Sequence, residues 1–154
     1  DSQAMENDSE GSGTSTTQMK KIAIVILNWN GKKLLEEFLP TVVRHSSFPD
    51  VEIVVADNGS TDASVEMLRQ DFPSVRVILL DQNHGFADGY NLALQQVEAD
   101  YVVLLNSDVE VTEHWLEHYL EDQLHADIRM TTILFVLRRY GMVLQNLIYN
   151  CKHG

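Results

Sequence analysis

The chain has 154 residues, a formal net charge of −12 and a single cysteine, Cys151. This length suits one domain with a substantial core, and the acidic balance argues against nucleic acid or an anionic membrane surface as the main partner. A lone cysteine excludes an internal disulfide, and the sequence shows neither a signal peptide nor a membrane-length apolar run, so we expect a cytoplasmic protein, with action near the inner face of a membrane left open.

The chain divides into three segments by composition. Residues 1–19 are mainly Ser, Thr, Gly and acidic residues with almost nothing to bury, so we expect a disordered leader or a cloning remnant there. An α/β domain is expected over residues 20–120. Residues 121–154 form a C-terminal segment of the same domain, without an assigned structure.

Four runs rich in apolar residues have the length of strands buried on both faces. They cover residues 22–27, 51–56, 75–80 and 101–105. Segments with helical spacing of apolar residues separate them. Strands that alternate with helices predict an α/β, Rossmann-like fold, with a mostly parallel open sheet and helices on both faces.

The expected helices carry their own local signals. Pro40 is expected to kink or divide the first helix, and Ser60 or Thr61 is expected to cap the second. A third helix covers about 86–97, and a fourth begins near Thr112. Beyond it, residues 131–137 and 142–149 read either as a strand and a helix or as two helices.

Polar residues follow the first, second and fourth expected strands. The carboxyl ends of parallel strands share one edge, so Trp29, Asp57 and Asp108 are drawn toward one crevice. An aromatic ring, an acceptor carboxylate and a cation-binding carboxylate suit the base, the ring N–H and the phosphates of a nucleotide diphosphate. The alternatives are packing for Trp29, a turn for Asp57, and a turn with a helix cap for Asn106 and Asp108.

Other polar positions are weaker candidates. Four residues near the start of the third helix form a candidate pocket wall, or simply let that helix pack closely: Asn83, Gly85, Gly89 and Asn91. We interpret His84 as a surface residue, and His114 and His118 as solvated. Neither GxxxxGK[ST] nor GxGxxG occurs, which weakens the NTPase and dehydrogenase interpretations.

Four stretches in order resemble the signatures of family 2 glycosyltransferases. They are IVILNWNG at 24–31, EIVVADNGSTD at 52–62, NHGFADGYN at 83–91 and LLNSDVEV at 104–111. The resemblance implies an A-type glycosyltransferase fold, apparently truncated, and inverting transfer of a sugar from a nucleotide-diphosphate donor to a saccharide or other hydroxyl acceptor. It also implies Mg²⁺ or Mn²⁺ as cofactor.

The resemblance assigns residues to this donor site. Trp29 and Asp57 would contact the base, and Asn106 and Asp108 would be the ends of a DxD-like motif, with Asp108 on the metal. Together with the residues around them, the expected donor-binding set is Asn28, Trp29, Asn30, Asp57, Asn83, Gly85, Asn91 and Asn106.

The sequence departs from the family in two ways. Asp88 stands where a small residue is common, and its charge near a diphosphate would be unfavourable unless it points away. After Leu120 no acceptor-loop pattern and no persuasive general base is recognised, so the catalytic residue stays unassigned.

Three interpretations therefore remain. The first is the donor-binding part of an inverting glycosyltransferase. The second is an inactive nucleotide-sugar-binding or interaction module that lacks the acceptor half. The third is an assembly module whose apolar residues 128–149 pack on a second copy, which would make the protein a homo-oligomer.

Overall fold

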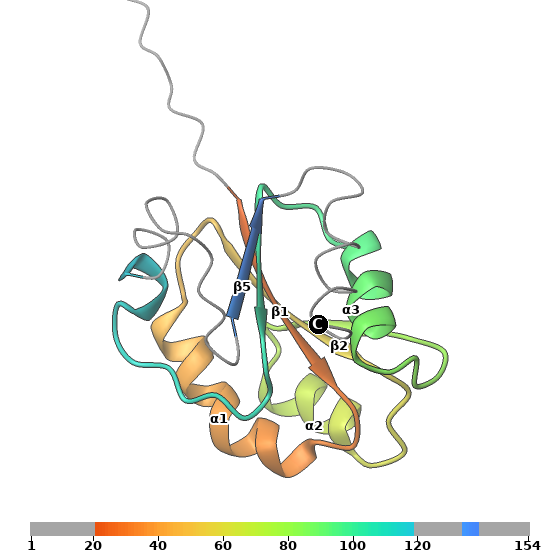
Figure 1. Ribbon diagram of the computed structural model, residues 1–154. Coiled ribbons are helices and arrows are strands. Elements are labelled where there is room, and N and C mark those ends of the chain that lie inside the picture. Colours follow the sequence, from red (N-terminus) through yellow and green to blue (C-terminus); the bar gives the residue numbers. More distant parts are fainter. Residues whose placement is uncertain (1–20, 119–133, 139–154) are drawn as a thin grey trace, which may run out of the picture.

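The computed structural model describes residues 21–118 and the backbone of residues 134–138. Five strands form one sheet in the order β3-β2-β1-β4-β5 (Figure 1). The bounds are Ile22–Asn28 for β1, Val51–Asp57 for β2, Arg76–Leu79 for β3, Tyr101–Leu105 for β4 and Leu134–Arg138 for β5. The four strands β1 to β4 run parallel, as predicted, and β5 pairs antiparallel with β4.

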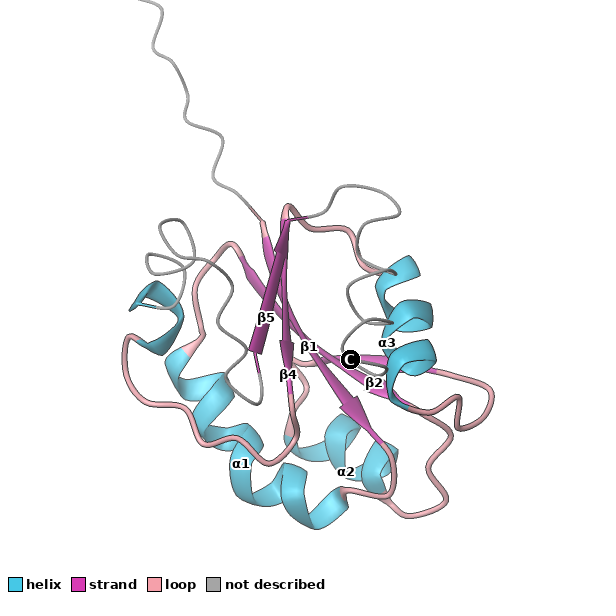
Figure 2. Ribbon diagram, viewed as in Figure 1, coloured by secondary structure: helices cyan, strands magenta, loops and turns pink. Residues whose placement is uncertain are grey.

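The parallel strands are rich in apolar residues because helices cover both faces of the sheet. Helices α1 (Lys32–His45) and α2 (Ser64–Asp71) lie on one face of the sheet, and α3 (Phe86–Gln95) lies on the other (Figure 2). Leu35 and Leu39 of α1 are buried in the core layer between the sheet and α1 and α2. Ala93 of α3 is buried in the core layer on the opposite face of the sheet. The prediction of helices on both faces is confirmed.

Two local predictions about the helices are resolved by the structure. The helix α1 is a single element with Pro40 inside it, so of the two expected effects of the proline, division of the helix does not occur, and a kink stays a prediction. Its buried residues before and after the proline pack into the same core layer and hold the helix together. The helix α2 begins at Ser64 without a side-chain cap, because Ser60 and Thr61 bond to the loop after β1 instead.

The chain after β4 is hydrogen-bonded to α1 and to the residue that follows it. The Val111 amide donates to Thr41 Oγ1 at 3.2 Å, and Trp115 Nε1 donates to Ser46 Oγ at 3.0 Å. A helix begins at Trp115, slightly later than predicted. The strand at residues 134–138 agrees with the strand-and-helix interpretation of the tail, while the predictions for 1–19 and for residues 139–154 lie outside the described residues.

Candidate functional site

The carboxyl ends of β1, β2 and β4 lie at one edge of the sheet, as predicted. The chain leaves β1 into α1 on one face, whereas it reaches β4 from α3 on the other face. The boundary between β1 and β4 is therefore the point where the winding of the sheet reverses, which is where open α/β sheets bind ligands. Trp29, Asp57 and Asp108 follow or end these three strands.

Asn28 and Asp57 form a buried pair at the ends of β1 and β2. Asn28 Nδ2 donates to Asp57 Oδ1 at 3.0 Å, and the two residues are 1% and 3% exposed. The amide of Ser60 donates to Asp57 Oδ2 at 2.9 Å, so both carboxylate oxygens have partners within the protein. The structure thus gives Asp57 the turn role that was the alternative prediction, and any base contact would add to these bonds.

The loop after β1 is bonded to the loop after β2. Asn30, with a left-handed φ of 49°, accepts on Oδ1 from the amides of Thr61 at 2.7 Å and Asp62 at 3.2 Å. The amide of Asn30 donates to Ser60 Oγ at 2.9 Å. Asn30 therefore shapes the edge of the site through its own bonds.

Asp62 joins the starts of two helices. Its carboxylate accepts from the Lys32 amide at 3.2 Å, at the start of α1, and from the Ser64 amide at 3.0 Å and the Ser64 hydroxyl, at the start of α2. Desolvation is the largest single influence and raises the pKa of Asp62, but the hydrogen bonds from Ser64 and Lys32 together outweigh it and hold that pKa below its ordinary value. An acid at two helix starts also interacts favourably with the helix dipoles.

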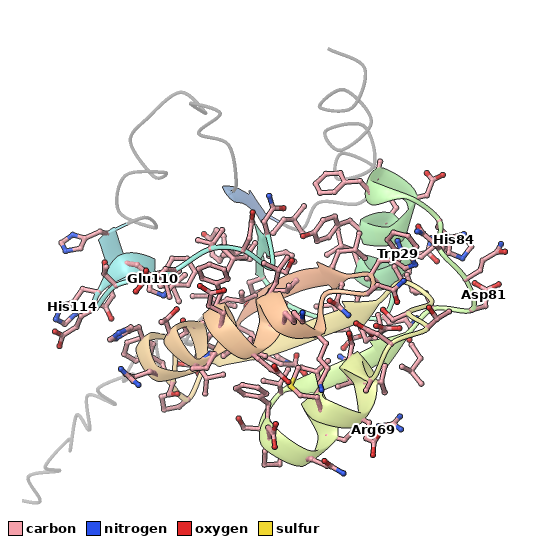
Figure 3. All side chains as sticks on the ribbon, turned by 90° about the horizontal axis from the view of Figure 1, so that it is seen from below. Trp29, Arg69, Asp81, His84, Glu110 and His114 are labelled. Carbon is pink, nitrogen blue, oxygen red and sulfur yellow. The ribbon has the colours of Figure 1, made fainter. Side chains whose placement is uncertain are left out.

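The ring of Trp29 lies at the surface, beside the hydrogen-bonded loops that follow β1 and β2. Its side chain is 56% exposed, and Figure 3 shows it at the opposite side of the molecule from His114. An exposed indole held on a fixed strand end offers a flat face on which a planar ring can stack. The alternative prediction, packing in the core, does not describe this position.

Asn58 organises the loop at residues 83–85, and the sequence analysis missed it. Its Nδ2 donates to Asn83 Oδ1 at 3.1 Å and to the Gly85 carbonyl at 3.0 Å, and its Oδ1 accepts from the His84 amide at 3.0 Å. Asn58 is 2% exposed, whereas Asn83 and Gly85 lie at the surface. The only signal in the sequence was a second polar residue directly after Asp57 at a buried strand end.

The predicted pocket wall is only partly assembled. Gly85 has a φ of 79° and lies directly before α3, and its amide donates to Asn83 Oδ1 at 2.8 Å. Asn91 lies on α3, and its buried Oδ1 has no hydrogen-bond partner among the described residues. The structure therefore links Asn83 and Gly85 directly, while among the described residues Asn91 is not hydrogen-bonded to either of them. Asp88 is exposed.

Asn106 and Asp108 follow β4 in a turn. Asn106 is half-buried, Asp108 is exposed, and neither side chain is hydrogen-bonded to another described residue. The next helix begins only at Trp115, so the alternative in which Asp108 caps it does not hold. The Asp108 oxygens are thus accessible to a cation.

A cation at Asp108 would take few ligands from the described protein. Within residues 21–118 and 134–138, no three His, Cys, Asp or Glu side chains are grouped so as to hold a metal ion. Mg²⁺ commonly binds through one or two carboxylates together with substrate phosphates and water. A lone exposed carboxylate fits that mode and does not fit an all-protein metal centre.

Two of the described histidines, His84 and His114, are paired with acids. His84 Nε2 lies 2.5 Å from Asp81 Oδ1, and this hydrogen bond lowers the pKa of Asp81. The side chain of His84, interpreted from the sequence as a surface residue, is 22% exposed. His114 Nδ1 lies 2.7 Å from Glu117 Oε2, on the far side from Trp29 (Figure 3), and His118 is exposed.

No helix among the described residues is long and apolar enough to cross a membrane. The sequence matches the family model "Glycosyl transferase family 2" over residues 23–136. It is 29% identical over 107 residues to a teichoic acid poly(glycerol phosphate) polymerase of Staphylococcus epidermidis, covering 67% of this chain and 15% of that protein. It is 30% identical over 124 residues to an uncharacterized glycosyltransferase of Bacillus subtilis, covering 79% of this chain and 31% of that protein.

Solved structures share the fold. A mannosyltransferase of Pyrobaculum calidifontis, solved in complex with GDP-Man and Mn²⁺, superposes with a TM-score of 0.59 at 23% identity, over 68% of this chain and 32% of that one. TarS of Staphylococcus aureus, residues 1–349 in complex with UDP, superposes with a TM-score of 0.57 at 25% identity, over 66% of this chain and 31% of that one. The chain thus spans about a third of each of these solved chains.

Proposed function

The chain belongs to glycosyl transferase family 2, and from this membership we propose that its sheet edge binds a nucleotide-diphosphate sugar for transfer to a hydroxyl acceptor. The observation that carries the proposal is the arrangement of Trp29, Asp57 and Asp108 on the carboxyl ends of three neighbouring parallel strands. GDP-Man with Mn²⁺ in one structural neighbour and UDP in another support this class of donor.

The base side of the donor is assigned to the ends of β1 and β2. Trp29 would stack on the base through its exposed ring, and Asp57 would accept a hydrogen bond from a ring N–H. Asn28 and Asn30 hold these two strand ends in place through their bonds to Asp57 and Ser60. Because Asp57 is already paired, its geometry is fixed before a base arrives.

The diphosphate side is assigned to β4 and to the start of α3. Asp108 would hold Mg²⁺ or Mn²⁺, with Asn106 beside it, and Asn83, Gly85 and Asn91 would form the wall. A divalent cation, when bound, would offset the negative charge that develops on the departing diphosphate. Asp108 supports this role because it is exposed and its carboxylate has no partner among the described residues.

Transfer would proceed by direct displacement with inversion. The acceptor hydroxyl would attack the anomeric carbon, the bond to the diphosphate would break, and the hydroxyl proton would pass to a general base. That base is not assigned among residues 21–118. The acids that follow Leu120 in the sequence, Glu121, Asp122 and Asp127, lie outside the described residues.

A second candidate is a binding module that holds a nucleotide sugar without transferring it. It is favoured by the sites assigned above, all of which belong to the donor side. Cytoplasmic location and homo-oligomer formation through residues 128–149 stay predictions.

Calorimetric titration of UDP- and GDP-sugars, with and without Mn²⁺, tests donor binding. Asp108→Asn is expected to abolish the Mn²⁺-dependent part of the affinity. Glu110→Gln is the matched control, because Glu110 is an exposed acid two residues away, and it is expected to bind like the wild type. Metal-independent binding, or equal loss in both variants, would contradict the assignment of Asp108.

Release of nucleoside diphosphate separates the two candidate functions. A transferase should release it from the donor when an acceptor sugar or, more slowly, water takes the glycosyl group. A binding module should bind the same donor and release nothing.

A further inference from the structure

The pairing between β1 and β4 ends before β1 itself ends, at the edge of the sheet that carries the site. β1 pairs with β2 as far as Asn28↔Asp57, but with β4 only as far as Ile26↔Leu105. Leu27 and Asn28 therefore extend beyond the last β4 pair. This is the same boundary at which the winding of the sheet reverses.

The hydroxyl of Tyr90 lies at the point where these strands part. It accepts a hydrogen bond from the Leu27 amide at 3.3 Å and donates one to the Leu105 carbonyl at 3.0 Å. Tyr90 is 1% exposed, so water does not substitute for it. A side chain from α3 thus links the two strand ends where the ladder between them stops.

The packing of α3 explains how the hydroxyl arrives there. A Cβ at Gly89 would lie 3.0 Å from Leu27 Cδ2 and 3.0 Å from Asn58 Nδ2, so the absence of a side chain lets the helix approach the end of β1. The ring of Phe86 meets the ring of Tyr90 edge-on, with centroids 5.0 Å apart. The close approach of α3 to the end of β1 and the contact with the Phe86 ring therefore hold the phenol of Tyr90 in place.

The hydroxyl keeps its donor role at neutral pH. Burial raises the pKa of Tyr90, and the hydrogen bond from the Leu27 backbone opposes this only in part. The proton that bonds the Leu105 carbonyl is thus retained.

We propose that Tyr90 is a positioning residue, whose hydroxyl sets the spacing between the end of β1, which carries Trp29, and the end of β4, which leads to Asp108. This rests on the proposed function, in which the base is held from β1 and β2 and the diphosphate from β4. The affinity for a ligand that contacts both strand ends depends on the spacing between them. The affinity for a ligand that contacts only the β1 side does not depend on that spacing.

Tyr90→Phe tests the proposal, because it keeps the ring and removes the hydroxyl. Titration with UDP or GDP and Mn²⁺, using the full chain well below its unfolding temperature, should show affinity weakened by about tenfold, as expected for a lost positioning contact. Affinity for the corresponding nucleoside, uridine or guanosine, should change by less than about twofold. A general loss of structure would weaken both ligands together.

Two further variants make the result decisive. Val97→Ala truncates a buried residue of the same core layer, beyond the far end of α3, and should lower the melting temperature without changing the affinity for the diphosphate. Gly89→Ala retains the hydroxyl but places a Cβ 3.0 Å from Leu27 Cδ2 and 3.0 Å from Asn58 Nδ2, so that α3 or these side chains have to shift by a few tenths of an ångström, and the same selective loss is expected even if Tyr90→Phe does not fold.

The outcomes separate the two proposals. If the wild type binds neither UDP nor GDP with Mn²⁺, the proposed function fails and the role of Tyr90 fails with it. If the wild type binds and the Tyr90→Phe variant binds equally well, or Val97→Ala weakens binding to the same extent, only the role of Tyr90 is overturned.

Discussion

Gly59 is the residue on which the close packing of two site loops depends. It has a φ of 76°, and a Cβ there would lie 2.7 Å from the backbone carbon of Gln82. Gly59→Ala is therefore expected to lower the free energy of unfolding by more than about 1 kcal/mol, from the left-handed conformation alone, with the backbone contact adding to it. Urea denaturation measures this change.

Gly59→Asn distinguishes the two causes. Asn tolerates a left-handed backbone better than Ala does, but it brings the same Cβ toward Gln82. If the close contact dominates, the two variants lose similar stability. Full tolerance of both substitutions would contradict the packing of these loops.

Asp62 should make the stability of the fold depend on pH. Its pKa in the folded chain lies below its ordinary value of 3.8, so the unfolded chain binds its proton first as the pH falls. The stabilisation is thus present above about pH 4 and is lost as the pH decreases through the folded-state pKa. Asp62→Asn should reduce the fall in urea midpoint between pH 5 and pH 3, whereas Glu110→Gln should leave it unchanged.

The sequence revealed the ends of the strands but not the bonds between the loops. Asp57 and Asn58 are adjacent polar residues after an apolar run, and nothing local says that Asn58 bonds residues 83–85. Ser60 was predicted to cap a helix for the same reason. Its bond to the Asn30 amide joins residues 30 positions apart, so the local sequence does not reveal it. Such long-range bonds depend on the register of the sheet, which the pattern of apolar residues does not specify.

The helix α1 tolerates a proline in its interior. Pro40 has no amide to donate to the carbonyl one turn earlier, and Leu35, Leu39 and Val42 retain the helix by packing on the sheet. Pro40→Ala is expected to raise the free energy of unfolding by about 1 kcal/mol, less than the ~3 kcal/mol of propensity scales, because proline also restricts the unfolded chain.

Denaturation in urea tests this prediction, with Glu37→Ala as a control at an exposed position of the same helix. The control should change stability by less than about 0.5 kcal/mol. Destabilisation by Pro40→Ala would show that the proline ring contributes packing that exceeds the cost of its missing hydrogen bond.

The elements themselves could be predicted because burial on both faces makes the parallel strands rich in apolar residues. Val51–Asp57 and Tyr101–Leu105 differ from the predicted strands by one residue at most. The cap of α2 and a division of the first helix at Pro40 were wrongly predicted because tertiary packing and bonds between loops override local propensity.

At the scale of the whole molecule, the acidic surface and the proposed anionic donor oppose each other. The chain carries a net charge of −12, and a nucleoside diphosphate stays anionic even with one Mn²⁺ bound. The site therefore has to bind the diphosphate through local contacts, against the repulsion from the net negative charge of the protein. A basic site would instead attract a phosphate over a long range.

Salt should accordingly strengthen donor binding or leave it unchanged. An increase from 0.1 M to 1 M NaCl shortens the Debye length from about 10 Å to about 3 Å and screens the long-range repulsion, while the contacts of Trp29 and Asp108 act at shorter range. The affinity for UDP or GDP at saturating Mn²⁺, measured by calorimetry, is expected to rise by about twofold, with uridine or guanosine as the uncharged control. A steep fall in affinity with salt would instead indicate that local cations, such as Lys33 at the start of α1, outweigh the net charge of the chain.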